Sequence, residues 1–385
     1  MPKTPIDLAQ EVELHAARLG PVMKAATVLG LASLGLVIAV VGASAIPEQA
    51  GKQSAPAPGP APLGCSKFAA PSGSDGNRGT RRRPFATPQR LANALRPGQV
   101  GCLAAGTYDG SDDDYVLRVN HGGRPRAPIT IRGYPPRAAK LVGIVSVPHG
   151  SDNVRLSNLT IEGSGDENTI KIYAADVTIK GNDITNDSRG RSCLILGNNS
   201  DSEAAVRTIV TLNRFYECGA SENDNEDHAI YAANVHRARI VANLFWGSAA
   251  YAIQFYPNAR NSIFAHNVVD GDTPSVRGGI VFGGDDDYAS RNNKVERNVI
   301  AFATTNGITS NWDETVGSGN LARFNCVSSR LEAIQTEHGG FTAYGNVFGD
   351  PGFVDRTNRD YRLRRGTRCR RTVGYDTGAL IARRR

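Results

Sequence analysis

Three titratable side chains in neighbouring segments of the chain could transfer protons. His228 directly follows Asp227, a carboxylate that could orient the imidazole ring. Lys171 and Tyr231 lie in two short apolar segments of one kind, TIKIY and AIYAA. A base that removes a proton beside a carboxylate, and an acid that protonates a leaving oxygen, could come from this set. We therefore predict His228, Lys171 and Tyr231 as catalytic candidates; a structural role at the start of a strand is the alternative for the histidine.

Tyrosine and amide side chains recur beside these candidates. Tyr173 follows Lys171 by two positions, and Gln254 and Tyr256 occupy a similar segment further along the chain. Tyrosine offers a flat apolar face and a hydroxyl group, a combination that suits sugar rings. We predict that Tyr173, Gln254, Tyr256 and Arg277 bind substrate. The alternative is that they are ordinary exposed residues.

Two acidic loops flank these segments. Residues 222–227 precede His228, and Asp285, Asp286 and Asp287 follow the segment GIVFG. Clustered carboxylates can bind Ca²⁺ through oxygen atoms, and a metal ion there could neutralise a uronate carboxylate and acidify its α-proton. Asp285, Asp286 and Asp287 are therefore the predicted Ca²⁺ ligands. The spacing of a calcium-binding loop is not met, so solvated turns are the alternative.

An internal repeat indicates how these segments are positioned. Segments such as VTLNRFYE, IVANLFWG and FAHNVVDG share an asparagine, at spacings of 21 to 31 residues. The aligned asparagines are Asn158, Asn182, Asn213, Asn243, Asn267, Asn298, Asn325 and Asn346. A second short strand lies between them, and its inward-facing residues align as Ile170, Leu194, Ile230, Ile253, Ile280, Ile308 and Ile334. Because side chains alternate along a strand, Lys171, Tyr231 and Gln254 should share the outward face. With Tyr173 and Tyr256 they are predicted to form one exposed groove, with His228 at its wall and Asp285–Asp287 at its rim.

A repeat of this kind favours a solenoid of stacked coils. A single coil cannot bury its Ile, Val and Phe side chains, whereas stacked neighbours can. Aligned asparagines can hydrogen-bond along the stack and satisfy polar groups in the turns. No amphipathic helix of 10–15 residues separates the strands, which argues against an alternating β/α fold. The composition, 40% apolar and 21% charged, excludes wholesale disorder and a polytopic membrane protein.

The stretch AAPSGSDGNRGTRRRPFATPQRLANALRPGQVGCLAAGTYDG resembles the opening cap of exported right-handed parallel β-helix proteins of the pectin-lyase-like superfamily. Within it, Thr87 can cap a helix whose first residue is Pro88, and Pro97-Gly98 can end that helix. DPGFVDRTNRDYRLRRGT is similar to the usual closing segment. The resemblance covers about residues 65–380. It implies an all-β, right-handed parallel β-helix of about eight to ten coils with a short N-terminal capping helix.

The superfamily includes lyases, hydrolases, epimerases and non-enzymes, so the resemblance does not select a reaction. The Asn-Thr-Asp, Gly-His-Gly and Arg-Ile-Lys patterns of polygalacturonases are missing, as is the Asp-Pro-His pattern of alginate epimerases. Two hypotheses remain. The chain is either a polysaccharide lyase that cleaves an acidic polysaccharide by β-elimination, or a non-catalytic cell-surface protein that binds glycans or has a structural role.

The N-terminal region predicts export. Residues 25–42 are uncharged and strongly apolar, follow Lys24, and lie near the minimum length that spans a bilayer. Ala43-Ser44-Ala45 fits a signal peptidase site. Residues 1–45 are thus predicted as a cleaved signal peptide or a retained transmembrane anchor, with the rest outside the cytoplasm. A Pro/Ala-rich linker (46–64), an N-terminal cap (65–128), β-helix repeats (129–349) and a C-terminal cap with an Arg-rich tail (350–385) follow.

Six cysteines lie beyond the apolar run. An even number in an exported chain predicts disulfides, and sequential pairing is the simplest of fifteen connectivities. That pairing joins Cys65 to Cys102, Cys193 to Cys218, and Cys326 to Cys369. No C-x-x-C motif or zinc-finger spacing occurs, so structural zinc is not predicted.

Positive charge is concentrated at the C-terminus. Residues 356–385 hold eleven arginines against two aspartates, a balance of +9, whereas the whole chain carries +7. Such a segment attracts nucleic acid, anionic lipid or acidic polysaccharide without selecting among them; a solvated tail is the alternative. Aromatic residues do not interleave with the arginines in a recognisable motif, so we predict a polysaccharide or cell-envelope glycan as partner and no nucleic acid.

Overall fold

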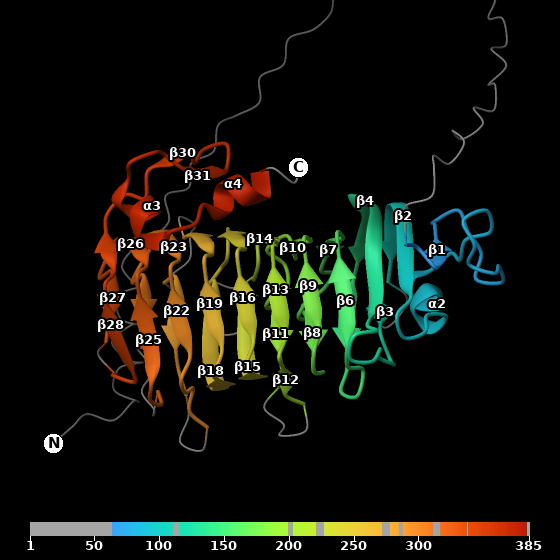
Figure 1. The fold of residues 1–385 in the computed structure, drawn as a ribbon, viewed down its shortest axis with the longest axis horizontal. Coiled ribbons are helices and arrows are strands. Elements are labelled where there is room, and N and C mark those ends of the chain that lie inside the picture. The colour runs from blue at the N-terminus through green and yellow to red at the C-terminus, as the bar shows by residue number, and fades with distance from the viewer. Residues whose placement is uncertain are drawn as a thin grey trace, which may run out of the picture. The chain divides into compact units, whose positions relative to one another are not determined.

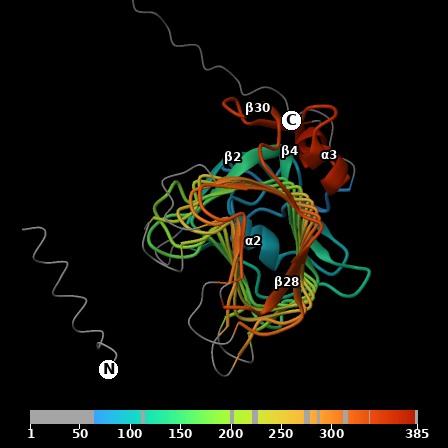
Figure 2. The same cartoon turned by 90° about the vertical axis from the view of Figure 1, so that its left-hand side faces the viewer.

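The computed structural model describes residues 64–110, 115–198, 203–220, 227–271, 278–284, 288–310, 316–336 and 338–382. They form a right-handed parallel β-solenoid of about 8 turns (Figure 1), at the lower end of the expected range. Seen along the axis, the coils superpose into one closed outline (Figure 2). The predicted signal or anchor segment and the linker up to residue 63 lie outside the described residues. Within the described ranges, no helix is long and apolar enough to cross a membrane.

One side of the solenoid is a ten-stranded sheet, in which strands of successive coils pair in parallel. Its strands are β3 (Tyr115–Arg118), β5 (Ile144–Val147), β8 (Ile170–Ile172), β11 (Leu194–Leu196), β12 (Ala205–Val206), β15 (Ile230–His236), β18 (Ile253–Arg260), β21 (Ile280–Phe282), β24 (Ile308–Thr309) and β27 (Ile334–Gln335).

The other two sides are arms of a 19-stranded sheet that starts from β1 (Lys67–Ala69), β2 (Val100–Asp109) and β4 (Ile129–Val142). The first half of β4 pairs with the first arm and its second half with the second arm. The first arm contains β6 (Val154–Ser157), β9 (Thr178–Lys180), β13 (Ile209–Thr211), β16 (Arg239–Val241), β19 (Ile263–Ala265), β22 (Lys294–Glu296), β25 (Asn320–Arg323) and β28 (Phe341–Tyr344). The second arm contains β7 (Thr160–Glu162), β10 (Asp183–Thr185), β14 (Arg214–Tyr216), β17 (Leu244–Trp246), β20 (Val268–Asp270), β23 (Val299–Ala303), β26 (Cys326–Ser329) and β29 (Val347–Phe348).

The core runs the length of the solenoid as stacks of like residues. The inward column predicted from the sequence is confirmed, because its members are register partners in successive strands from Ile170 to Ile334. Phe215 stacks on Phe245 with ring centroids 4.9 Å apart, and Phe255 stacks on Phe282 at 5.4 Å. Each fully buried apolar side chain stabilises the fold by roughly 1.5–3 kcal/mol.

A ladder of buried asparagines occupies the corner between the two arms. At each rung, the side-chain oxygen of one asparagine accepts hydrogen bonds from the backbone and the side chain of the asparagine one coil earlier. For Asn213 and Asn243 both distances are 3.0 Å, and Asn243 also donates to the Val210 carbonyl at 2.9 Å. The ladder runs through Asn182, Asn213, Asn243, Asn267, Asn298, Asn325 and Asn346. The predicted asparagine corner is thereby confirmed for seven of the eight residues.

Asn158 does not belong to this ladder. In the register of β7 and β10, Leu159 takes the position of Asn182 and donates its backbone N–H to the Asn182 side chain at 2.9 Å. Asn158 is aligned with Gly181, and both adopt a positive φ of 55° and 70°. Asparagine and glycine tolerate this left-handed conformation. The sequence alignment was therefore wrong by one residue in the first repeat, because the turn selects asparagine for a different reason there.

A second polar ladder, which the sequence analysis did not identify, supports the corner between the ten-stranded sheet and the first arm. The Ala238 N–H donates to Ser262 Oγ at 3.1 Å, Ser262 N–H donates to the Asn293 side chain at 2.9 Å, and Asn293 N–H donates to the Asn320 side chain at 3.0 Å. Asn293 and Asn320 are fully buried. Two of the three corners are thus held by polar side chains in register.

At the N-terminal end, α2 (Pro88–Asn93) lies within the outline of the coils (Figures 1 and 2). As predicted from the sequence, Thr87 caps this helix: its side chain accepts the Arg90 N–H at 3.1 Å, and Pro88 is the first helical residue. Leu91 and Leu95 are buried in the same apolar cluster as the first coils. The helix therefore covers the apolar interior that the first coil would expose to water.

The Arg-rich C-terminal segment is not a solvated tail. The antiparallel pair β30 (Phe353–Asp355) and β31 (Asp360–Leu363), with α3 (Arg368–Val373) and α4 (Thr377–Ala382), folds back along the second arm (Figure 1). Arg356 forms a bidentate pair with Asp270 at 2.8–3.1 Å and lies 4.1 Å from the Phe302 ring centroid. Tyr361 also donates to Asp270, at 2.9 Å. Up to Ala382, the alternative of a solvated tail is therefore wrong.

All three predicted disulfides are present. The Cα separations are 5.8 Å for Cys65–Cys102, 5.4 Å for Cys193–Cys218 and 5.1 Å for Cys326–Cys369. The first joins Cys65, just before β1, to β2, and the last holds α3 against β26. Disulfides persist in oxidising compartments, which supports an exported protein.

We expect Asn243→Ala to lower the free energy of unfolding by about 2–3 kcal/mol, because it leaves buried donors of Asn213 without an acceptor. Asn346→Ala is the matched control at the half-buried end of the ladder, where water can replace the lost amide. It should cost less than half as much. Chemical unfolding followed by circular dichroism measures both; equal losses would contradict a role for burial along the ladder.

Candidate functional site

The outward candidates Lys171, Tyr231 and Gln254 lie on the ten-stranded sheet in one column. Lys171 and Tyr231 are both register partners of Ile195, and Tyr231 pairs with Gln254. Adjacent strands lie about 4.8 Å apart, so Lys171 and Tyr231 are separated by about 10 Å along the axis. Lys171 and Tyr231 are half-buried, whereas Gln254 is 1% exposed. The column exists as predicted, but the expectation that Gln254 lines an exposed groove is wrong.

Lys171 is held by an acidic and an aromatic neighbour. Its Nζ atom lies 2.7 Å from Glu167 Oε2 and 5.8 Å from the ring centroid of Tyr115. The hydrogen bond from Lys171 lowers the pKa of Glu167, and the nearby charges of Lys171 and Arg191 add to the effect. The side chain of Lys171 is 14% exposed. The ammonium group therefore has a fixed position at the surface of the sheet.

Tyr173 lies at the end of the same strand, one step beyond β8. Burial raises the pKa of Tyr173 to about 12, and the negative charge of Glu203 acts in the same direction. Its phenol therefore keeps its proton at neutral pH. Tyr173 can donate a hydrogen bond or supply a proton there, but it is not a base.

His228 does not line an exposed surface. It is fully buried. Its backbone N–H donates to Ser192 Oγ at 3.2 Å, and its ring Nδ1 accepts the backbone N–H of Tyr251 at 3.3 Å. Its ring contacts those of Tyr231 and Tyr251, with centroids 5.7 and 5.6 Å away. The prediction that His228 forms the wall of a groove is wrong. At the corner between the second arm and the ten-stranded sheet, the imidazole accepts a hydrogen bond from a buried backbone N–H. Other polar side chains have the same role in the turns of this solenoid.

Gln254 and Tyr256 both belong to β18, near the middle of the ten-stranded sheet. Among the described residues, the buried side-chain oxygen of Gln254 has no hydrogen-bond partner. Tyr256 is half-buried and packs over Gly283, where an added Cβ atom would lie 3.1 Å from its ring. Of the two side chains, only that of Tyr256 is accessible to a ligand.

Several predicted site residues lie outside the described residues: Arg277, the acidic residues 222–226, and Asp285, Asp286 and Asp287. Asp227, at the edge of the first acidic loop, is buried. Among the residues that the structure describes, no group of three His, Cys, Asp or Glu side chains could hold a metal ion. The Ca²⁺ site at Asp285–Asp287 therefore stays a prediction.

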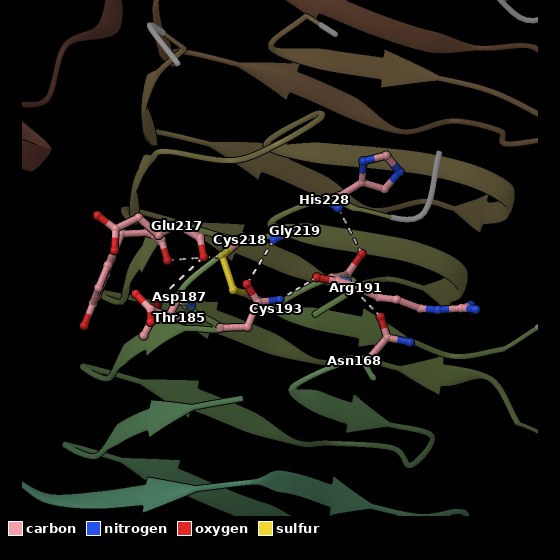
Figure 3. The surroundings of a disulfide bond; sticks show 12 residues. Asn168, Thr185, Asp187, Arg191, Cys193, Glu217, Cys218, Gly219 and His228 are labelled. Atoms are coloured by element: carbon pink, nitrogen blue, oxygen red, sulfur yellow. Dashed lines mark hydrogen bonds between the residues drawn. A yellow bond between two sulfur atoms is a disulfide. The ribbon is translucent and has the colours of Figure 1, made fainter. Parts of the chain in front are cut away.

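The disulfide between Cys193 and Cys218 fixes the strands that carry the column (Figure 3). Cys193 directly precedes β11, which lies between the strands of Lys171 and Tyr231. Its N–H donates to the His228 carbonyl at 3.1 Å, and the Leu194 N–H donates to Ala229 at 3.1 Å. The bridge thus ties the start of β11 to the segment that follows β14 in the next coil.

A comparison with protein families shows to which family the chain belongs. A family model matches residues 71–332, which include every coil that carries the column. The chain belongs to the family described as a protein of unknown function (DUF1565). No curated protein matches this DUF1565 chain.

Solved structures confirm the fold of the DUF1565 chain. Pectate lyase Pel9A superposes with a TM-score of 0.56 at 14% identity, over 80% of this chain and 91% of that chain. A structure titled rhamnogalacturonan lyase superposes with a TM-score of 0.51 at 12% identity, over 77% and 92%. The resemblance to the pectin-lyase-like β-helix is thereby confirmed. At these identities, the likeness shows the fold alone.

Three residues around Lys171 in this family member were not predicted from the sequence: Tyr115, Glu167 and Glu203. Tyr115 starts β3, in an earlier coil of the same sheet, and Arg118 lies 5.6 Å from its ring centroid. In the strand register, Lys171 aligns with Ser146 and Arg118 rather than with Tyr115, so the strand pattern carries no signal for Tyr115. Glu167 and Glu203 lie in loops beside β8 and β11, where the strand pattern carries no signal.

Removing the Cys193–Cys218 bridge should loosen the strands around Lys171. We expect the double variant Cys193→Ala, Cys218→Ala to lose about 3 kcal/mol of stability. In this variant, the backbone amides of residue 193 and of Leu194 should exchange hydrogen faster than in the wild type. The control Cys65→Ala, Cys102→Ala removes a bridge far from β11, and should leave exchange at Leu194 unchanged. Hydrogen exchange by mass spectrometry checks this, and unchanged protection in the first variant would contradict the positioning role.

Proposed function

We propose that this protein binds an acidic polysaccharide across the outer face of the ten-stranded sheet. Lys171 pairs with a sugar carboxylate, and Tyr173, Tyr231 and Tyr256 contact sugar rings. The observation that carries the proposal is the Lys171 cluster, in which an ammonium group is held by Glu167 against Tyr115. A cation beside half-buried aromatic rings is suited to a ligand that is both acidic and flat-faced.

The column suits a polymer because its side chains belong to successive coils. A chain of sugars that follows the solenoid axis meets Lys171, then Tyr231, then Tyr256 over three strand spacings. Gln254, the register partner of Tyr231, is buried and is not among the side chains that contact the sugars. Arg277 and the Ca²⁺ ligands Asp285, Asp286 and Asp287 remain part of the proposal as additional groups that recognise carboxylates.

β-Elimination is the second candidate function. The observation that favours it is the position of Tyr173, a protonated phenol two residues after Lys171 and therefore on the same face of the sheet. In this scheme Lys171 neutralises the uronate carboxylate, Tyr173 protonates the leaving oxygen and Tyr231 is the candidate base. Lyases among the proteins of similar fold support it. His228 is not part of this scheme, because its imidazole is buried.

Export to the cell surface fits either function, since an intact polysaccharide is found outside the cytoplasm. The three disulfides support export. We propose residues 1–45 as the signal peptide or signal anchor that delivers the β-helix there.

We expect Lys171→Gln to weaken binding of a galacturonate trimer at least tenfold, since a charge-assisted hydrogen bond contributes roughly 1.5–3 kcal/mol. Lys140→Gln is the matched control. It breaks a Lys140–Glu162 pair of the same 2.7 Å length on the 19-stranded sheet, and should leave affinity unchanged. Isothermal titration calorimetry with and without Ca²⁺ measures both. Equal affinities of the two variants would overturn the assignment of Lys171.

The absorbance of unsaturated uronate products distinguishes the two functions. Polygalacturonate, alginate and glycosaminoglycans are incubated with the wild-type protein in the presence of Ca²⁺. Elimination predicts product formation that falls at least tenfold in Tyr173→Phe, whereas trimer binding falls much less. Binding without product would refute elimination and leave the binding function in place.

A further inference from the structure

A row of basic side chains follows the solenoid axis at the corner where the ten-stranded sheet meets the first arm. His236 is the register partner of Arg260, and Arg260 is bridged to Arg291 in the next coil. Arg237 follows His236 and lies beside Arg260, because its N–H donates to the Arg260 carbonyl at 2.9 Å. We call His236, Arg237, Arg260 and Arg291 the basic corner.

The positive charge of the basic corner is not neutralised by any residue that the structure describes. No described residue forms an ion pair with Arg237, Arg260 or Arg291, whereas Arg207 at the N-terminal end of the row is paired with Asp176 at 2.6 Å. Arg237 and Arg291 are exposed. The Arg260 Nε atom donates no hydrogen bond to a described residue. Three guanidinium groups in successive coils thus retain their capacity to bind anions.

The basic corner is rigid, because it rests on the second polar ladder. Ala238, Ser262 and Asn293 follow the corner residues of three successive coils, and each hydrogen-bonds to the next coil. The spacing between basic residues is therefore the strand spacing, about 4.8 Å per coil. A preorganised row loses little conformational freedom when it binds a ligand.

Electrostatic repulsion within the row is visible at His236. Burial, and then the positive charges of Arg260 and Arg237, hold the pKa of His236 below its usual range. The neighbouring guanidinium groups are thus close enough to disfavour a further positive charge. An anion bound at the corner would relieve this repulsion.

We propose that the basic corner is a second binding surface, which takes a linear acidic polysaccharide lying parallel to the solenoid axis. A stiff polymer with an anionic group on each sugar can present one carboxylate or sulfate to each coil. Asn261 and Asn292 are exposed beside Arg260 and Arg291 and offer amide groups to sugar hydroxyls. The described side chains of the row include no Phe, Tyr or Trp ring on which a nucleobase would stack, and the one imidazole, that of His236, is half-buried, which favours a polysaccharide over single-stranded nucleic acid.

This surface is separate from the face that carries Lys171. Tyr231 and His236 lie near opposite ends of β15, so the two surfaces are about 15 Å apart. The inference does not depend on the proposed function. A polymer anchored along the corner would be retained at the protein whether or not the sheet face binds or cleaves it.

The test compares two triple variants with the same loss of charge. Arg237→Gln, Arg260→Gln, Arg291→Gln empties the basic corner, and Arg82→Gln, Arg365→Gln, Arg368→Gln removes three arginines elsewhere. Circular dichroism verifies the fold of each. Binding to long polygalacturonate and to heparin is measured over a series of salt concentrations. We expect the corner variant to bind at least tenfold more weakly, with a slope of log K against log salt reduced by about two to three. The control should stay near wild type.

Further measurements distinguish the possible sources of binding. A galacturonate trimer, the probe for the sheet face, should bind the corner variant as it binds the wild type, and failure of the trimer to bind any protein would count against the sheet site alone. Equal losses of polymer binding in the two triple variants would overturn the inference, because net charge would explain them. A corner variant that loses binding to single-stranded DNA or to anionic phosphatidylserine vesicles, but not to the polysaccharides, would overturn it as well.

Discussion

Pairing of parallel strands at one constant spacing is the constraint on which the rest of this structure depends. A coil of three short strands has no core and no paired edges of its own, so it is stable only against neighbours in the same register. The asparagine ladder enforces that register at the corner between the arms, because each side chain hydrogen-bonds both to the previous coil and to the next one. The end coils lack a neighbour on one side, and α2 covers the interior at the N-terminal end.

Because the coils stack in one register, residues at equivalent positions of the repeat form continuous surfaces. Once Ile170 and Ile230 point inward, Lys171 and Tyr231 must point outward on one face, whatever their chemistry. This geometry produces elongated surfaces in which each coil contributes one or two side chains. Insertions between strands change the loops without disturbing the columns, so loop residues such as Glu167 and Glu203 can tune a column that the strands position.

The repeat and the period-2 pattern therefore made most of the fold predictable, including the column from Ile170 to Ile334, and sequential pairing of six cysteines predicted the three disulfides. Prediction failed where a residue type has two physical uses. Asparagine forms ladder rungs but also tolerates positive φ, which misplaced Asn158. Histidine can be a base or a buried acceptor for a backbone N–H, and His228 is the latter. Burial of Gln254 depends on packing outside its own strand, which alternation within the strand does not encode.

The distribution of the arginines shows that a high density of charged residues in the sequence does not locate a binding surface. Part of the densest cluster, in the C-terminal segment, is used by the fold: Arg356 pairs with Asp270, and Arg359 lies 4.9 Å from the Trp246 ring centroid and 3.8 Å from Glu217. Those contacts attach the segment to the second arm. The arginines of the basic corner are more than twenty residues apart in the sequence at Arg237, Arg260 and Arg291, and only the stacking of coils brings them together. Because no acidic side chain among the described residues pairs with them, the solenoid concentrates there a charge that the sequence disperses.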